Sequence, residues 1–314
     1  MCHEGFLHFL SSPDSLKSIC HVITYIEVPF HIFGVYCIVA KTPGRMKNVK
    51  WNLLIMHFSI ICLNLIMSFL LIPFMMVPAL AGVPLGFLEE LGVPQKFQMY
   101  LAVTGPAGTE SATVYLFESR ASINIDNTFR FTRARSRLIY YTGTLALNCM
   151  IYTLFIFKVP EDQEAAKLDI LKFIPCPTRE FITEPAFVPA DQEWSNFMLM
   201  CLIPIFLAIG ASQFLFFFSL SVYYLFVCKL SFSISHQTRK MQLCFFLGIL
   251  ALVLIPFVIQ AFPYVVITVM MKNDKLTQAM TNIYFIVFGM HGCVGSVVIL
   301  FVHKGYRNTI FRFF

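Results

Sequence analysis

Six stretches of about 20 or more mostly apolar residues restrict what this chain can fold into more than any other feature of the sequence. About 20 such residues are needed for a helix to cross the hydrocarbon core of a bilayer. Composition agrees with this reading, because 58% of the 314 residues are hydrophobic, 35 of them Phe, and only 13% are charged. A soluble domain is about 25% charged. The apolar stretches lie at about 18–40, 51–80, 138–157, 195–228, 241–271 and 280–302.

A seventh span is expected at 97–119, although Gly105, Pro106, Gly108 and Glu110 dilute its apolar character. Leaving it out would put the Arg-rich segment 120–137 and the Lys-rich segment 41–50 on opposite sides of the membrane. We therefore predict an all-α membrane protein, a seven-transmembrane helix bundle in which residues 1–314 form a single domain.

The distribution of basic residues predicts the orientation of the bundle. Fifteen Lys and Arg lie in the segments expected on one side, and eight lie on the other. Because cytoplasmic loops carry the excess of Lys and Arg, the N-terminus is expected outside and the C-terminus in the cytoplasm. The first residues lack the pattern of a removable signal peptide, so the first span is expected to act as an uncleaved signal anchor.

One outer connection, 158–194, is long enough to fold over the mouth of the bundle as a lid, or it forms a loose tether. Loops of this length are usually either functional or disordered. Cys2 and Cys176 lie outside the spans, where a disulfide between them is an open question.

Three acidic residues, Glu27, Glu110 and Glu118, fall within predicted spans, where ionisable side chains usually face the bundle interior. Glu27 and His31 are four residues apart on one helix face and can hydrogen-bond to each other. They form either a titratable couple or a mutually satisfied polar pair. His57 and Asn64 also share a helix face, and packing between helices is their expected role.

Glu110 lies about 20 Å along the third helix, between the polar residues Thr109 and Ser111. Its carboxyl group either contacts a polar group of a ligand or bonds to a neighbouring helix. In the seventh span, Gly289, Gly292 and Gly295 are three residues apart and form a smooth strip for close helix contact. Beside this strip, His291 either lines the interior or is a buried, satisfied histidine.

The motif FESR, residues 117–120, places an acid and a base at the expected cytoplasmic end of the third span. Residues two apart on a helix do not face each other, so a local salt bridge between Glu118 and Arg120 explains the motif poorly. Each side chain is expected to reach a different neighbour, unless Arg120 extends to the lipid headgroups. We expect the two residues to restrain the resting state and Arg120 to be freed on activation.

The sequence resembles the nematode serpentine chemoreceptors, most closely the class H (Srh) family. The resemblance runs from the first helix to the tail and is carried by four stretches. These are IEVPFHIFGVYCIVAKTPGRMKNVKWNLL (26–54), FESR (117–120), GMHG (289–292) and HKGYR (303–307). It implies a G-protein-coupled receptor of chemosensory neurons, in the plasma membrane and at a sensory cilium. A small odorant or pheromone-like ligand, a heterotrimeric G protein and the lipid bilayer are the partners implied.

The residues expected to carry this function fall into two groups. Glu110, Thr109, Gln260 and Tyr264 are expected to contact the ligand. The switch and the G-protein surface are expected to use seven residues, Glu118, Arg120, Arg133, Arg135, His291, Tyr306 and Arg307. We expect no enzyme activity, cofactor, metal or nucleic-acid partner, because the sequence has no Gly-rich phosphate loop, metal-ligand cluster or nucleophile elbow.

Two other function classes fit a chain with these spans. A seven-span ligand-gated channel subunit, as in insect odorant receptors, is expected to have its N-terminus inside, against the Lys and Arg distribution. A transporter would require several intramembrane carboxylates with basic partners, and often paired repeats. Three acids, no deep base and an odd number of spans argue against it.

Overall fold

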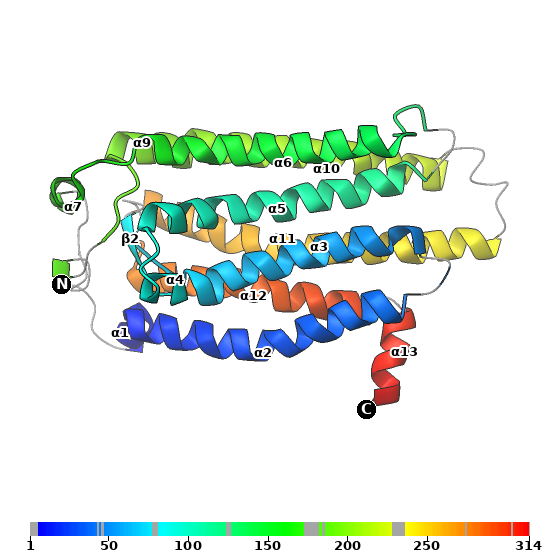
Figure 1. The fold of residues 1–314 in the computed structure, drawn as a ribbon, viewed down its shortest axis with the longest axis horizontal. Helices are drawn as coiled ribbons and strands as arrows, with labels where there is room; N and C mark the ends of the chain where they lie inside the picture. The colour runs from blue at the N-terminus through cyan, green and yellow to red at the C-terminus, as the bar shows by residue number, and fades with distance from the viewer. Residues whose placement is uncertain are drawn as a thin grey trace.

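Seven long helices run alongside one another in the described part of the computed structural model (Figure 1). The structure describes residues 6–42, 44, 47–76, 81–123, 127–172, 182–183, 186–227, 236–273, 275–302 and 304–313. Six of the long helices are α2 (Pro13–Ala40), α3 (Lys47–Leu65) with its π-helical extension η2 (Ile66–Leu70), α5 (Gln95–Ala121), α6 (Ala134–Phe157), α11 (His236–Lys272) and α12 (Gln278–Val302). The seventh is the continuous run of α9 (Gln192–Phe197), η3 (Met198–Leu202), α10 (Ile203–Val222) and η4 (Tyr223–Val227).

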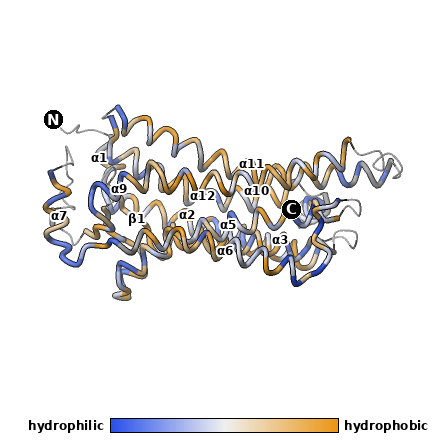
Figure 2. Tube along the Cα trace, turned by 90° about the horizontal axis from the view of Figure 1, so that it is seen from above, coloured by the Kyte–Doolittle hydropathy of each residue, from blue (hydrophilic) through white to orange (hydrophobic). Residues whose placement is uncertain are grey.

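Shorter elements gather at the two ends of the bundle. At one end lie α1 (Phe6–Ser11), α4 (Phe87–Glu90), α7 (Gln163–Leu171) and the hairpin of β1 (Pro73–Met76) with β2 (Ala81–Pro84), and at the other lies α13 (Lys304–Phe313). We call these the α7 end and the α13 end (Figure 1). Hydrophilic residues are concentrated at both ends, and hydrophobic residues line the length of the helices between them (Figure 2).

Five helical runs within the described residues are long and apolar enough to cross a membrane. They are α2, Lys50–Leu70, Gln192–Val227, Gln242–Lys272 and Gln278–Phe301. Large apolar side chains such as Tyr25, Ile32 and Phe262 are exposed on these helices, as suits a surface that faces lipid. α5 and α6 are not among the five. For α5, which carries Gly105, Pro106 and Glu110, this agrees with the dilution noted in the sequence, whereas α6 contains the predicted span 138–157.

The second predicted span, 51–80, is wrong in its last third. The helix ends at Leu70, and Pro73 opens a β-strand instead of lying inside a helix. The reason is local, because a residue before proline is disfavoured in the helical region, and Ile72 adopts a φ of 43°. Pro73 then pairs with Pro84 at the open end of an antiparallel hairpin, where neither residue needs an N–H.

The long connection 158–194 is folded against this hairpin where the structure describes it. Gly82 and Phe187 exchange two backbone hydrogen bonds, of 3.0 and 2.8 Å. Val188 is fully buried and bonds through its backbone N–H and C=O to the side chain of Gln163 in α7. This part of the connection is therefore held by the hairpin and α7. Cys2 and Cys176 lie outside the described residues.

Contacts within the bundle divide it into two neighbourhoods. α5 packs against α3, α6 and α10, whereas α12 packs against α2, α3 and α11. The largest apolar cluster joins these helices and includes Leu53, Phe117, Ile249 and Tyr306 of α13. It lies next to the charged residues described below.

Candidate functional site

A charge network lies near the α13 end of α5, built around Glu118. Its carboxyl group is fully buried, and Arg137 of α6 forms an ion pair with it, Nε to Oε2, at 2.9 Å. Ser122, one turn further along α5, donates a hydrogen bond of 2.6 Å to Glu118 Oε1. A buried carboxylate is stable only where charge and hydrogen bonds compensate for the lost water, and these two residues supply both.

Arg120 uses a different neighbour. Its Nη2 donates to the backbone carbonyl of Gln242, near the start of α11, at 3.2 Å. The two charged residues of FESR therefore reach α6 and α11 separately, as their spacing on the helix predicts. We call Glu118, Arg120, Ser122 and Arg137, with the Gln242 carbonyl, the charge network. It joins α5, α6 and α11 at one end of the bundle.

Arg137 belongs to the Arg-rich segment 120–137, but the sequence pattern did not predict its pairing with Glu118. The two positions are 19 residues apart, on helices whose relative rotation is fixed by packing. A signal was present, since Arg137 is the basic residue of this loop nearest to the apolar start of the fourth predicted span. Its side chain is 29% exposed, against none for Glu118.

The other residues expected near the switch lie in different surroundings. Arg133, Arg135 and Arg307 are exposed at the α13 end. Tyr306 is fully buried, and its hydroxyl lies 2.7 Å from the Thr42 hydroxyl, which ties α13 to the end of α2. Burial raises the pKa of the Tyr306 phenol, so it is neutral and able to donate this bond. Tyr306 therefore anchors α13, and the three arginines remain available to a partner.

His291 is buried in α12, and its Nδ1 donates a 2.7 Å hydrogen bond to the Phe288 carbonyl of its own helix. Its Nε2 is also buried, with no hydrogen-bond partner among the described residues. The structure does not bring His291 to the charge network. His291 is therefore a buried histidine with a hydrogen-bond partner for Nδ1 but not for Nε2 among the described residues.

Glu110 lies where α5 crosses α10, pressed against Gly210. A Cβ atom added at Gly210 would lie only 1.7 Å from Glu110 Oε1, so a side chain there would displace the Glu110 carboxyl group. Glu110 Oε1 is buried and has no hydrogen-bond partner within the described part of the chain. Such an orphan acceptor is costly unless another group supplies a donor.

The remaining predicted ligand residues do not gather around Glu110. The Thr109 hydroxyl bonds to the Pro106 carbonyl of its own helix at 2.8 Å. Tyr264 is half-buried in α11, a helix that packs mainly against α12 rather than α5. Gln260 also belongs to α11, but its side chain lies outside the described residues. A ligand that contacts all four predicted residues would have to extend from α5 to α11.

A second group of polar residues, which we call the polar seam, joins α2, α3 and α12. It consists of Glu27, His31, Asn64, Ser68 and Ser296, all of them buried. Glu27 and His31 do not bond to each other, so the expected pair is wrong. Asn64 Nδ2 donates instead to Glu27 Oε2 and lies 3.4 Å from His31 Nε2, because the Asn64 amide lies between the two side chains.

Glycines bring the helices of the polar seam together. A Cβ atom at Gly292 of α12 would lie 2.5 to 2.6 Å from the amide group of Asn64, and one at Gly34 of α2 would lie 2.8 Å from His57 Nε2. Gly289 and Gly295 also face α3, at Ser68 and Ile60. The strip predicted from the spacing of the α12 glycines is therefore confirmed, and α3 is the helix it contacts.

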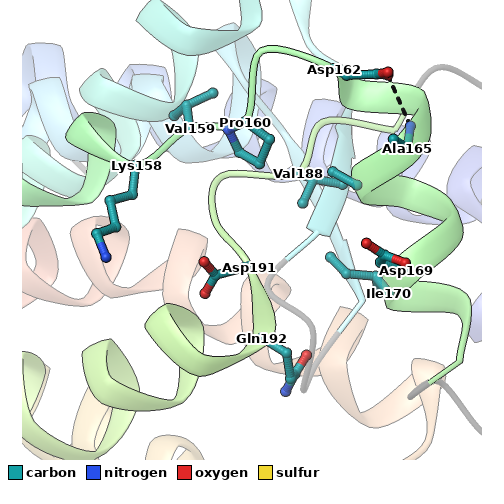
Figure 3. Close-up of a pocket in the computed structure, with 11 residues that line it drawn as sticks. Lys158, Val159, Pro160, Asp162, Ala165, Asp169, Ile170, Val188, Asp191 and Gln192 are labelled. Carbon is teal, nitrogen blue, oxygen red and sulfur yellow. Dashed lines mark hydrogen bonds between the residues drawn. The ribbon is translucent and has the colours of Figure 1, made fainter.

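A pocket of about 500 Å³ lies outside the bundle, where α7 and the start of α9 meet the loop after α6 (Figure 3). Two of its carboxylates cap helices, since Asp162 accepts from the Ala165 N–H and Asp191 from the Trp194 N–H. A third, Asp169, pairs with Lys172 at 2.6 Å. These carboxylates already have partners, so the pocket is a shaped surface of the loop rather than an assembled binding site.

Comparison with known proteins gives two matches. Residues 11–314 match the family described as serpentine type 7TM GPCR chemoreceptor Srh. The chain is also 33% identical over 303 residues to serpentine receptor class H-72 of Caenorhabditis elegans, which covers 96% of this chain and 86% of the relative.

Proposed function

The chain belongs to the Srh family of serpentine seven-transmembrane chemoreceptors, and we propose that its charge network is the switch that couples ligand binding to a heterotrimeric G protein. It is a chemosensory G-protein-coupled receptor and a multi-pass membrane protein with an all-α seven-transmembrane fold. The channel and transporter alternatives have no support from these matches.

The contact that carries the proposal is the ion pair between the fully buried Glu118 and Arg137, next to the Arg120 bond to α11. Together they join three helices at one end of the bundle. A G protein can enter between these helices only if they separate, and separation breaks both contacts. In this proposal, the contacts hold the resting state, and a ligand acts by favouring the arrangement in which they are broken.

We propose that the α13 end faces the cytoplasm. Its exposed side chains include Arg133, Arg135 and Arg307, in line with the excess of Lys and Arg on that side of the sequence. The same arginines supply a basic surface that can attract an acidic face of the G protein. The N-terminus then lies outside, and the plasma membrane of a sensory cilium is the proposed location.

The ligand is proposed to contact Glu110, with Thr109, Gln260 and Tyr264 as further candidates. Support comes from the unpartnered, buried Glu110 oxygen at the α5–α10 crossing. A small, largely apolar odorant or pheromone-like molecule with one hydrogen-bond donor would suit this carboxyl group and the apolar side chains around it, including Ala107 and Phe206. The covering loop would then restrict access from the α7 end.

A screen in cells tests this function. Cells expressing the full chain should give a calcium or cAMP response to some member of a panel of volatile and pheromone-like compounds, and Arg120→Ala should lose it. An epitope tag at Met1 should be accessible in intact cells. Staining only after permeabilisation, or a ligand-gated current that survives G-protein inhibition, would instead favour a channel.

A further inference from the structure

The polar seam holds two buried oxygen atoms that lack donors. Glu27 is 3% exposed and Asn64 is 1% exposed. Glu27 Oε1 and Asn64 Oδ1 are both buried without a hydrogen-bond partner among the described residues. The two side chains nevertheless contact each other, because Asn64 Nδ2 donates to Glu27 Oε2. Each group therefore has one satisfied atom and one orphan oxygen.

The hydrogens of the neighbouring groups are already used. Ser296 donates to the Gly292 carbonyl at 3.1 Å, so His31 Nδ1, 2.8 Å away, must donate to the Ser296 hydroxyl oxygen. His31 Nε2 is then the acceptor for the second hydrogen of Asn64 Nδ2, at 3.4 Å. Both hydrogens of the Asn64 amide are thereby spent, and His31 is neutral.

Other titratable groups near the seam supply no cation. His57 of α3 uses Nε2 on the His31 carbonyl, at 3.3 Å, and His291 of α12 uses Nδ1 on its own helix. The thiols of Cys20 and Cys293 also lie near Glu27, and a thiol supplies no positive charge. No Lys or Arg forms an ion pair with Glu27 in the described part of the chain.

We propose that Glu27 is a proton-binding site, with its proton on Oε1 shared with Asn64 Oδ1. A carboxylic acid and a primary amide are complementary, since each offers one donor and one acceptor on the same edge. Protonation gives donors to both orphan oxygens at once and removes a buried charge that no cation offsets. The pair then has two parallel hydrogen bonds, Asn64 Nδ2 to Glu27 Oε2 and Glu27 Oε1 to Asn64 Oδ1.

The surrounding helices hold this pair in place. Gly292 packs directly on the Asn64 amide, with no room for a Cβ atom, so the amide is confined between α3 and α12. Loss of the proton would leave a carboxylate facing a carbonyl oxygen inside the α2–α3–α12 contact. The proton therefore stabilises the contact of three helices, and this stabilisation is present at low pH and lost as the pH rises through the titration of Glu27.

Infrared difference spectroscopy on the purified full chain in lipid nanodiscs tests the site without a ligand or a G protein. The protonated carboxyl of Glu27 should give a C=O stretching band that shifts in deuterated water and decreases as the pH is raised. Glu27→Gln should lose this band, and Glu193→Gln, which changes an exposed carboxylate, should keep it. A spectrum unchanged by Glu27→Gln would overturn the proposal, because Glu27 would then be ionised and held by a solvent cation or a water molecule.

Thermal unfolding gives an independent readout. Gln imitates the neutral acid and can form the same two hydrogen bonds, so Glu27→Gln should remove the loss of stability that the parent shows at alkaline pH. An identical dependence on pH in the two proteins would contradict the proposal. If Glu27→Gln does not fold, Asn64→Leu serves instead, because an acid without its carbonyl acceptor should give a band shifted to higher frequency. Failure of these tests would leave the receptor function untouched.

Discussion

Replacing Arg137 by Met should destabilise the resting state by about 3 kcal/mol. Removing one partner of a buried ion pair costs about 3–5 kcal/mol, because the other charge is left uncompensated. The lower end of this range applies here, since Arg137 is 29% exposed and Ser122 still donates to Glu118. A chain of 314 residues with an unfolding entropy of about 2.1 cal/mol/K per residue would lose about 5 °C in its melting midpoint.

The assay is thermal unfolding of the purified chain, followed by a thiol-reactive dye that detects the buried Cys20 and Cys37 as they become exposed. Arg135→Met is the matched control, because this exposed arginine lies two residues away on the same helix. The double variant Glu118→Gln with Arg137→Met should recover most of the loss, because neither charge is left alone. If Arg137→Met melts with the parent, or if the double variant is the sum of the single ones, the ion pair does not hold the resting state.

Three further predictions concern other contacts. Gly210→Ala should lower the midpoint in the same melting assay, because its Cβ would displace the buried Glu110 carboxyl group, whereas Gly108→Ala, with nothing within 4 Å, should not. Equal melting midpoints for the two variants would show that the contact between Gly210 and Glu110 does not contribute to stability. Glu110→Gln should change ligand potency in the cell assay at normal surface expression, and unchanged potency would make Glu110 a packing residue. Tyr306→Phe should cost about 1 kcal/mol by losing its bond to Thr42, so a midpoint equal to the parent would show that this bond contributes nothing to anchoring α13.

The helical class of the fold followed from apolar length, because a bilayer requires long apolar helices whatever their packing. The β-hairpin at Pro73–Pro84 did not follow, because its residues are as apolar as those of a span and continue one without a polar break. The prolines at both ends of the hairpin were the available signal, but prolines also occur inside the helices, at Pro29 and Pro106.

Spacing on a single helix predicted which residues share a face, but not which residues meet across helices. It correctly separated Glu118 from Arg120 and indicated that Gly292 lies on a contact strip. It failed for Glu27 and His31, because an amide from another helix, Asn64, lies between them. The partners of buried polar groups depend on the relative rotation of helices, which a one-dimensional pattern does not contain.

Guanine-nucleotide exchange tests the charge network as a switch most directly. The purified parent, Glu118→Gln and Arg120→Ala would each be reconstituted in nanodiscs with a heterotrimeric G protein, without ligand. If the charge network is the switch, basal exchange will be higher for Glu118→Gln than for the parent, and Arg120→Ala will give the receptor-free rate. Equal exchange rates for all three proteins would contradict it.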